Sequence, residues 1–334
     1  MDPDSVAAVD RAPHGSSDDP DLLDFSANVN PRMPDGVPAV YEDALDAART
    51  YPPRGVPAFR AAAAAALDCD PAAVVPTAGG LQAIRLAIET TVGPGDSVLV
   101  PAPSFAEYAR EVRLQGADPV FVPHDDLLDA DPAGHALAVA CTPNNPTGDA
   151  YAPADLRSFA ARCRDAGTPL LVDEAFLGFT DLPSLAGEPG VVVARSLTKL
   201  FGLPGLRAGF AVATGDLHDA LATAVPPWAL GTPAARVGAH CLRDDAFVAH
   251  TRERVRTERA RLRERLAERF DVYPSDAPFL LLDVGAPPGP VVERARERGV
   301  AVRDATTFRG LDSHVRVAVR TPAENDRLLE ALDG

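Results

Sequence analysis

Lysine is almost absent from this chain. Lys199 is the single lysine among 32 lysine and arginine residues, so arginine carries nearly all of the positive charge. The arginine guanidinium keeps its proton in proteins, whereas a lysine amine can lose its proton and act as a nucleophile. Lys199 is therefore a candidate for a chemical role that arginine cannot fill, and the motifs around it indicate which role that is.

Positive charge as a whole is also scarce. The 334 residues include 48 Asp and Glu, which gives a net charge of −16 and a pI of about 4.8. A chain this acidic repels nucleic acid and anionic membrane surfaces, so we expect it to bind neither. The acid-rich, lysine-poor composition resembles that of cytosolic proteins adapted to high salt. A GC-biased genome is an alternative explanation for the same bias.

Cysteine clusters and long apolar runs are missing too. The cysteines form no CxxC pair and no His/Cys cluster with zinc spacing, which predicts reduced, buried thiols and no metal site; they are Cys69, Cys141, Cys163 and Cys241. No apolar run approaches the roughly 20 residues that a membrane span needs. The N-terminus is polar and acidic without a signal-peptide pattern, and we expect a cytoplasmic location.

Short apolar segments alternate with helical patterns between about residues 51 and 226. The segments that read as buried strands are 97–103, 119–123, 136–143, 169–175, 191–196 and 208–213. Continuous apolar strands joined by helices indicate a mostly parallel sheet with both faces covered. The pattern therefore predicts an α/β fold.

The C-terminal part of the chain has a different texture. A long amphipathic pattern rich in Arg and Glu predicts a helix over residues 243–270. Short strand patterns and two helical patterns follow it, which indicates a small α+β domain. The length allows one large and one smaller domain. We expect the large domain over residues 46–230 and the small domain over residues 1–45 together with 231–334.

Polar residues stand where the predicted strands end. Asn145 lies in "CTPNNPTG", Asp173 ends "PLLVD", and Ser196 and Lys199 follow "VVVAR", with Arg207 shortly after. Ligands of open parallel sheets bind outside the carboxyl ends of the strands. Gly79 and Gly80 open a helical pattern, and the free amides at a helix N-terminus attract an anion. The sequence thus predicts one site that combines an amine, a carboxylate and an anion cradle.

These residue types match the needs of pyridoxal 5'-phosphate. Its aldehyde needs an amine, which Lys199 supplies, and the Asp173 carboxylate would keep the pyridine nitrogen protonated. Asn145 would bond the phenolic oxygen, and Phe105 would stack on the ring. The cofactor phosphate would be held by Ser196, by Arg207 and by the amides of the Gly79–Gly80–Leu81 turn. Simpler interpretations are a surface lysine, a helix-capping aspartate, a turn at "NNPTG" and a core phenylalanine.

Over nearly its whole length the chain resembles the fold-type I aminotransferase superfamily. The resemblance rests on "YPPRG", "CTPNNPTG", "LLVDEAF" and "RSLTKLFGLPGLRAGF", which occur in the family's order. It implies a large domain with a mostly parallel seven-stranded sheet, a smaller α+β domain, pyridoxal 5'-phosphate as cofactor, and a homodimer with shared active sites. One departure is Gln82, which stands in the phosphate loop where members usually have glutamate.

Within that superfamily, further segments are similar to the threonine-phosphate decarboxylases of cobalamin synthesis, which are relatives of the histidinol-phosphate aminotransferases. These segments are "LLDFSANVNP" at 22–31, His14-Gly15, "PSFAEY", "PPW" at 226–228 and the C-terminal "GLDSHVRVAVRTPAENDRLLEAL". Phe176 belongs to the same set, because histidinol-phosphate aminotransferases usually carry tyrosine there. A tyrosine hydroxyl would contact the ring oxygen of the cofactor, so phenylalanine changes the electronics of the site.

The resemblance also implies roles for residues outside the strand ends. Arg316 would bind the substrate carboxylate and Arg303 the substrate phosphate, although Arg320 could take either role. Asn30 and His14 would line the substrate side, with disorder of the polar N-terminus as the alternative for His14. Tyr51 would reach the cofactor phosphate of the partner subunit. The small-molecule partner would be a phosphorylated amino acid.

The expected reaction is decarboxylation of L-threonine O-3-phosphate to aminopropanol phosphate. Histidinol-phosphate aminotransferase activity is the nearest alternative, because it uses the same clamps. A non-catalytic, cofactor-binding regulatory module is a remote alternative, since no helix-turn-helix extension is visible. A nicotinamide site is weaker still, because "GPGDSV" at 93–98 lacks the third glycine and precedes a strand.

Overall fold

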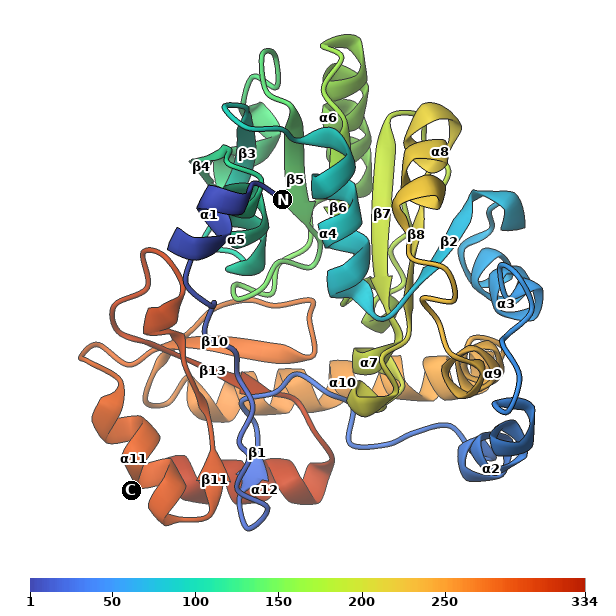
Figure 1. Cartoon of the computed structure of the whole chain (residues 1–334). Helices are drawn as coiled ribbons and strands as arrows, with labels where there is room; N and C mark the ends of the chain where they lie inside the picture. Colours follow the sequence, from blue (N-terminus) through green and yellow to red (C-terminus); the bar gives the residue numbers. More distant parts are fainter. Residues whose placement is uncertain (334) are drawn as a thin grey trace.

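A seven-stranded sheet forms the centre of the larger part of the molecule (Figure 1). The computed structural model describes residues 1–333, and the strand order is β2, β8, β7, β6, β5, β3, β4. The bounds are β2 Val74–Thr77, β3 Ser97–Ala102, β4 Asp118–Pro123, β5 Leu137–Cys141, β6 Leu170–Asp173, β7 Val191–Ser196 and β8 Gly209–Val212. Only β8 runs antiparallel, to both β7 and β2, so the predicted α/β fold with a mostly parallel sheet is confirmed.

One strand of this sheet is not predicted by the apolar pattern. β2 is short, contains Pro76 and lies at the edge of the sheet. Proline cannot donate to a ladder and is therefore confined to edge strands and bulges, which is why "VVPT" reads poorly as a strand. The other strands fall on the predicted segments.

Apolar side chains alternate between the two faces of the sheet, as the pleat requires. Along β7, Val191 and Val193 face the core that contains Phe59 and Phe159, whereas Val192 faces the opposite core. Helices α3 (Pro57–Leu67) and α6 (Pro153–Asp165) cover the first face, and α4 (Gly80–Thr91), α5 (Glu107–Leu114) and α8 (Gly215–Ala224) cover the second. Both faces of the central strands are thus buried, which accounts for their unbroken apolar runs.

A four-stranded antiparallel sheet forms the smaller part, which lies below the large sheet in Figure 1. Its order is β12 (Arg303–Asp304), β13 (His314–Ala318), β10 (Phe279–Asp283), β9 (Asp271–Val272). The helices beside it are α10 (Asp245–Leu266), α11 (Gly289–Glu297) and α12 (Pro322–Leu332). The long helix and the α+β texture are as predicted. Thr321 and Glu324 form a reciprocal capping box at the start of α12.

The N-terminal segment joins the two parts. It begins with α1 (Pro3–Ala8) beside α5 and continues to β1 (Leu23–Asp24), which pairs in parallel with β11 (Val300–Ala301); Figure 1 shows this dark-blue path. The Asp2 amide donates to the Leu114 carbonyl at 2.8 Å, and Arg110 Nε donates to the Asp10 carbonyl at 3.0 Å. These bonds attach the start of the segment to α5, and the β1–β11 pairing attaches its end to the C-terminal part of the chain.

The remaining helices are α2 (Val37–Ala47) and α9 (Thr232–Cys241), which pack together, and the short α7 (Leu197–Leu200) after β7. The division at residues 46 and 230 stays a prediction. Within residues 1–333, no helix combines the length and the apolar character that crossing a membrane demands.

Candidate active site

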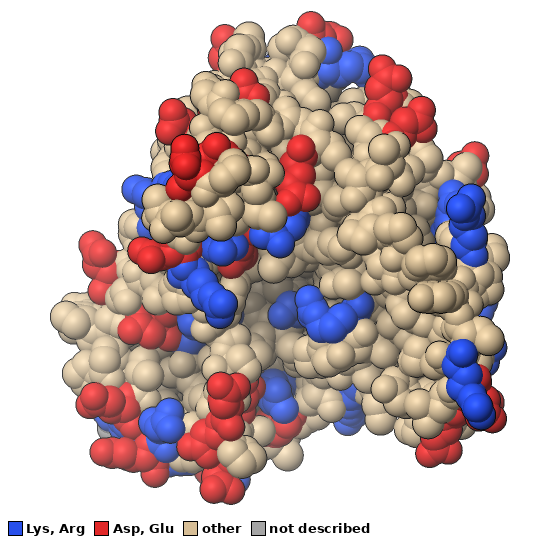
Figure 2. Space-filling view, in the orientation of Figure 1, with Lys and Arg blue, Asp and Glu red and all other residues tan. Residues whose placement is uncertain are grey.

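A cavity of about 390 Å³ lies where the carboxyl ends of β5, β6 and β7 face the small sheet. In Figure 2 the face shown is hollowed near its middle, and blue basic side chains gather around the hollow while red acidic ones lie mostly toward the periphery. Most of the predicted site residues line the cavity: His14, Gly80, Leu81, Phe105, Asn145, Asp173, Ser196, Lys199, Arg207, Arg303 and Arg316. Segments that are far apart in the sequence therefore meet at one site.

Lys199 lies on α7, directly after β7, and its side chain is largely buried. Burial lowers the pKa of its amine to about 8, and the positive charges of Arg316 and Arg207 act in the same direction. A substantial fraction of the amine is therefore neutral near physiological pH. The neutral amine is the form that attacks an aldehyde.

Asp173 ends β6 and is buried at the bottom of the cavity. Its Oδ2 accepts a hydrogen bond from the Tyr108 hydroxyl at 2.6 Å, and its Oδ1 accepts one from the Ala175 amide at 2.9 Å. Burial raises the pKa of Asp173, and these two hydrogen bonds oppose the rise. The positive charges of Lys199 and Arg195 also lower its pKa, although neither forms an ion pair with Asp173 within residues 1–333. The carboxylate thus has a fixed orientation and suits a cationic ring nitrogen.

Close backbone packing forms an anion cradle at the start of α4. A Cβ added to Gly80 would lie 3.0 Å from the Ser196 Cβ, and one added to Gly79, which has a φ of 96°, would lie 2.9 Å from Arg207 Nη2. Larger residues would therefore fill the space between the helix end, Ser196 and Arg207. The first-turn amides have no partner within the helix, so this gap can accept a phosphate.

Gln82, the departure from the family pattern, contacts the backbone of its own loop. Its Oε1 accepts a hydrogen bond from the Ala78 amide at 2.6 Å, so the side chain caps the loop that leads into α4. The departure from glutamate at this position is therefore compatible with the cradle, because an amide oxygen accepts this bond as a carboxylate would.

Aromatic rings and an amide border the middle of the cavity. Phe105 meets Tyr108 edge to face, with ring centroids 5.6 Å apart, and it lines the cavity as predicted. Phe176 is buried and packs edge-on against Phe279 at 5.1 Å. Asn145 Oδ1 accepts a hydrogen bond from Arg316 Nη1. The space above Asp173 is thus flat-sided and can hold an aromatic ring.

Two arginines of the small sheet form the opposite wall. Arg303 on β12 and Arg316 on β13 are direct cross-strand neighbours. Arg316 is 5% exposed, its Nη2 donates to the Ser26 carbonyl at 2.9 Å, and its Nε has no partner. Burial lowers the pKa of Arg316, and the charge of Arg303 adds to that effect. Within residues 1–333 neither guanidinium forms an ion pair, so both are available to anionic groups.

The hydrogen bonds of Arg303 tie it to the N-terminal segment. Its Nη2 donates to the Pro13 carbonyl at 3.0 Å and to Thr307 Oγ1 at 2.8 Å. His14 follows Pro13, and its Nε2 lies 2.9 Å from Glu107 Oε1. This contact and its place in the cavity lining bring His14 to the substrate side, where its role stays a prediction. Arg320, the alternative to either arginine, pairs with Glu324 and lies outside the cavity.

Three predicted residues are not on the cavity wall. Asn30 is buried elsewhere, where its Nδ2 donates to the Leu200 carbonyl at 2.7 Å and its Oδ1 accepts from Arg254. Gly79 contributes only through the approach of Arg207 described above. Tyr51 is 75% exposed and stacks on Trp228 with centroids 4.2 Å apart, so it does not reach the cavity of its own chain.

The cavity also contains residues that sequence reasoning missed. Asn28 lines it in place of Asn30, and its buried Oδ1 has no hydrogen-bond partner. Tyr108 is the partner of Asp173, and its place three residues after Phe105 is the signal that could have revealed it. Thr198 and Phe308 line the cavity as well. Nothing in the local sequence distinguishes Asn28 from Asn30.

The residues present fit pyridoxal 5'-phosphate. A partly neutral lysine, a buried carboxylate, a glycine cradle with an arginine, and flat aromatic walls occupy one cavity, and the orphaned Asn28 Oδ1 and Arg316 Nε still need polar partners. Lys199 would hold the aldehyde, Asp173 the pyridine nitrogen, and Ser196 with Arg207 the phosphate. The cavity thus contains a group for each polar part of the cofactor.

Comparisons with known proteins identify the family of this chain. A model of the family described as aminotransferase class I and II matches residues 20–332. A histidinol-phosphate aminotransferase of Symbiobacterium thermophilum is 37% identical over 269 residues, which cover 76% of this chain and 73% of that protein. A threonine-phosphate decarboxylase of Salmonella typhimurium is 32% identical over 330 residues, which cover 93% of this chain and 90% of that one.

Solved structures give the same result for the fold. L-threonine-O-3-phosphate decarboxylase from Porphyromonas gingivalis superposes with a TM-score of 0.85 at 26% identity, covering 93% of this chain and 98% of its own. Histidinol-phosphate aminotransferase from Sinorhizobium meliloti, solved in complex with pyridoxal-5'-phosphate, has a TM-score of 0.83 at 21% identity and covers 93% of this chain and 89% of its own. The predicted fold class and cofactor are confirmed.

Proposed function

We propose that this chain, which belongs to the aminotransferase class I and II family and uses pyridoxal 5'-phosphate, decarboxylates L-threonine O-3-phosphate. The product would be (R)-1-aminopropan-2-yl phosphate, a building block of cobalamin. The observation that carries the proposal is that Arg303 and Arg316 lie side by side on the cavity wall and that neither forms an ion pair within residues 1–333. Threonine phosphate has one phosphate and one carboxylate, and a guanidinium fork matches either group.

The position of these two clamps bears on the choice of reaction. When bound, pyridoxal 5'-phosphate withdraws electrons from whichever bond at the substrate Cα stands perpendicular to its ring. Arg316 and Arg303 fix two ends of the substrate and therefore its rotation about that ring. We assign the carboxylate to Arg316, because it is the more deeply buried of the two and lies beside Asn145.

The remaining residues bind and move protons. Lys199 Nζ, with its pKa lowered to about 8, can hold a proton and donate it to the substrate Cα, where the new C–H bond replaces the bond broken on loss of CO2. The Asp173 carboxylate holds the ring nitrogen, and Phe105 packs on the ring face. Phe308 and Phe279 surround Arg316 at 5.7 and 5.2 Å from its Cζ and exclude water from the carboxylate.

Phe176 supports decarboxylation over transamination. Phe176 brings an apolar ring to the cavity. The resemblance to histidinol-phosphate aminotransferases implies that those enzymes usually have a tyrosine hydroxyl at this position. Without that hydroxyl, the phenolic oxygen of the cofactor depends on Asn145 alone among the residues assigned to it. The different hydrogen bonding would alter the electronic balance of the ring.

Histidinol-phosphate aminotransferase activity is the second candidate. Relatives with that name are 37% and 32% identical to this chain. Histidinol phosphate has a phosphate but no carboxylate, so Arg303 would hold it, and Arg316 would be used only by the carboxylate of the second substrate, 2-oxoglutarate. Histidinol-phosphate aminotransferase activity therefore predicts that a phosphorylated amine without a carboxylate binds well.

We also propose that two copies of the chain form a dimer. Tyr51 and Trp228 are 75% and 55% exposed, and Met33 and Tyr41 are exposed as well. The resemblance to fold-type I aminotransferases implies that Tyr51, the tyrosine of "YPPRG", reaches the cofactor phosphate of the partner subunit. A second copy would cover these apolar side chains and deliver Tyr51 toward the exposed guanidinium of Arg207.

The deciding experiment offers each substrate to the cofactor-loaded protein. L-threonine O-3-phosphate should release CO2 and give aminopropanol phosphate, and the Lys199→Ala variant should not. Histidinol phosphate with 2-oxoglutarate should give no glutamate. Amino transfer without CO2 release would refute the decarboxylase proposal while leaving the family and the cofactor unchanged. A Phe176→Tyr variant, assayed in parallel, should raise any amino transfer relative to decarboxylation.

A further inference from the structure

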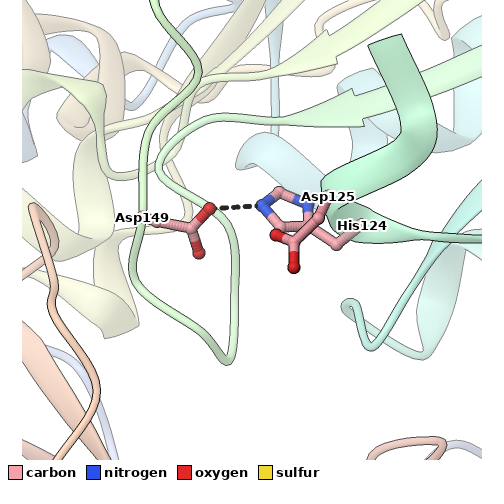
Figure 3. Close-up of side chains that lie close together, drawn as sticks. All are labelled: His124, Asp125 and Asp149. Atoms are coloured by element: carbon pink, nitrogen blue, oxygen red, sulfur yellow. Dashed lines mark hydrogen bonds and ion pairs between the residues drawn. The ribbon is translucent and has the colours of Figure 1, made fainter. Parts of the chain in front are cut away.

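A polar cluster lies outside the cavity, behind the loop that carries Asn145. His124 begins the 3-10 helix His124–Asp129 after β4, and Asp149 lies in the loop after β5. His124 Nε2 and Asp149 Oδ2 are 2.7 Å apart, and Figure 3 shows this contact with the nearby Asp125. His124 is 3% exposed, so the contact joins a buried ring to a partly exposed carboxylate. The reaction described above uses neither residue.

The other side of the imidazole is also held. The Tyr151 hydroxyl lies 2.7 Å from His124 Nδ1 and donates to the His124 carbonyl at 3.0 Å. Both ring nitrogens therefore have partners, and the ring has a single orientation. A histidine fixed on both sides gives the carboxylate of Asp149 a rigid anchor.

Asp149 connects the fixed His124 ring to the loop through hydrogen bonds. Its Oδ1 accepts a hydrogen bond from Thr147 Oγ1, which itself accepts one from Asn144 Nδ2 at 2.9 Å. The Asn144 amide donates to the Asp149 carbonyl at 2.8 Å, and the Gly148 amide donates to the Asn144 carbonyl at 2.8 Å. Residues 144–149 thus form a closed turn, with Asn145 inside it.

Asn145 is the residue of this turn that faces the cavity, where its Oδ1 accepts a hydrogen bond from Arg316. We propose that His124 and Asp149 are positioning residues: through Thr147 and Asn144 they fix the 144–149 turn so that Asn145 meets the cofactor ring and Arg316. The inference rests on the role proposed for Asn145 toward the cofactor. It does not depend on which substrate the enzyme uses.

The cluster has the composition of a metal site as well. One ligand atom from each of His124, Asp125 and Asp149 lies within 4.8 Å of the others. The hydrogen-bond reading is favoured because His124 and Asp149 are already at hydrogen-bond distance and Asp149 is bonded onward to Thr147. Within residues 1–333 Asp125 forms no hydrogen bond or ion pair with either residue, so a metal ion would need Asp125 as a ligand and the hydrogen-bonded chain would not. This difference makes Asp125 the matched control.

The test measures the bound cofactor without substrate. In the pyridoxal 5'-phosphate-loaded protein, Asp149→Ala should move the pH midpoint of the cofactor's visible absorption change upward by about one unit, because a displaced Asn145 no longer stabilises the ionised ring oxygen. Cofactor affinity should fall on the order of tenfold. Asp125→Ala should leave both values unchanged. Thr147→Val keeps the contact between His124 and Asp149 and removes only the hydrogen bond from Thr147 to Asp149. It should shift the absorption midpoint upward by less, and it replaces Asp149→Ala in the test if that variant does not fold.

A double-mutant cycle then separates positioning from general stability. If Asp149 acts through Asn145, Asp149→Ala should cause no further shift in the Asn145→Ala background. Additive shifts would overturn the proposal, as would a lower melting temperature with an unchanged absorption midpoint. Equal losses in Asp125→Ala and Asp149→Ala, reproduced by EDTA treatment of the unmodified protein, would assign the cluster to a metal ion instead. None of these outcomes depends on decarboxylation, so a failure of the proposed function is recognised separately.

Discussion

The two sides of the cavity are built in different ways. The floor, formed by Asn145, Asp173, Ser196 and Lys199, consists of residues at the ends of neighbouring strands of one sheet. The wall, formed by His14, Asn28, Arg303 and Arg316, comes from the N-terminal segment and the small sheet. The floor is a fixed set of groups that suits any chemistry of its cofactor. The wall depends on long-range packing, and we infer that it selects the substrate.

Removing the amine of the floor should have the largest effect. Lys199→Met should lower decarboxylation of threonine phosphate by roughly a thousandfold or more, because no other residue in the chain has a side-chain amine to replace it. CO2 release measures the loss. Retention of more than a few per cent of the activity would mean that the floor does not contain the reacting group.

The same substitution should make the apoprotein more stable. The pKa of Lys199 is lowered to about 8 in the folded chain, from 10.5, so the folded state binds fewer protons than the unfolded state between these values. Stability of the unmodified apoprotein should therefore rise with pH from 8 to 10, by roughly 3 kcal/mol in full. Lys199→Met should abolish this rise and melt at a higher temperature at pH 7. If the difference in stability between the unmodified protein and Lys199→Met did not change with pH, burial would not be what lowers the pKa of the Lys199 amine.

Changes in the wall should alter substrate binding instead of the chemistry of the cofactor. Arg316→Lys should reduce kcat/KM for threonine phosphate by roughly 10- to 100-fold, because a single ammonium replaces a charge-assisted fork. The absorption spectrum of the bound cofactor should change little. If phosphoethanolamine, which has no carboxylate, inhibits the variant and the parent equally, the carboxylate is the group that Arg316 binds. If the variant loses affinity for phosphoethanolamine as strongly as for threonine phosphate, Arg316 binds the substrate phosphate and not the carboxylate.

Arg303→Gln tests the other half of the wall and should have a smaller effect. Arg303 is less buried than Arg316 and already donates to Pro13 and Thr307, so part of its hydrogen-bonding capacity is used. We expect KM to rise by about tenfold with kcat changed much less. The phosphate analogue should lose affinity while an amino acid without phosphate should not. The reverse pattern would exchange the assignments of the two arginines.

The difference between floor and wall also explains what the sequence could reveal. The floor was predictable because each of its residues ends an apolar strand or lies in the short segment that follows one, and parallel strands bring their carboxyl ends together. Asn28 and Asn30 cannot be told apart in the same way. They share a short irregular segment, and only the packing of Asn30 against Leu200, Thr251 and Arg254 takes its side chain out of the cavity.

Arg303 and Arg316 show the intermediate case. Their strand patterns are readable, but three arginines in that region have similar surroundings in sequence. Arg320 is excluded only by its bonds to Glu324 and to the Asp24 carbonyl, which arise from α12 and β1. The hydrogen-bond partner of Asp173 was not predicted for a similar reason. Tyr108 is three residues from Phe105, yet the bond from its hydroxyl to Asp173 depends on the distance between α5 and β6.

Tyr108 offers the smallest effect and a test of the floor's independence from substrate. Tyr108→Phe removes the 2.6 Å hydrogen bond to Asp173 Oδ2 and leaves a buried carboxylate with one donor fewer. The apoprotein should lose on the order of 1 kcal/mol of stability or more. Pyridoxal 5'-phosphate brings a ring N–H to the same carboxylate, so it should restore part of the loss, and activity should fall only a fewfold. Melting of apo and loaded protein measures both states. If the loss were the same in both, the ring nitrogen would not be the group that Asp173 holds, and the floor would need a different assignment.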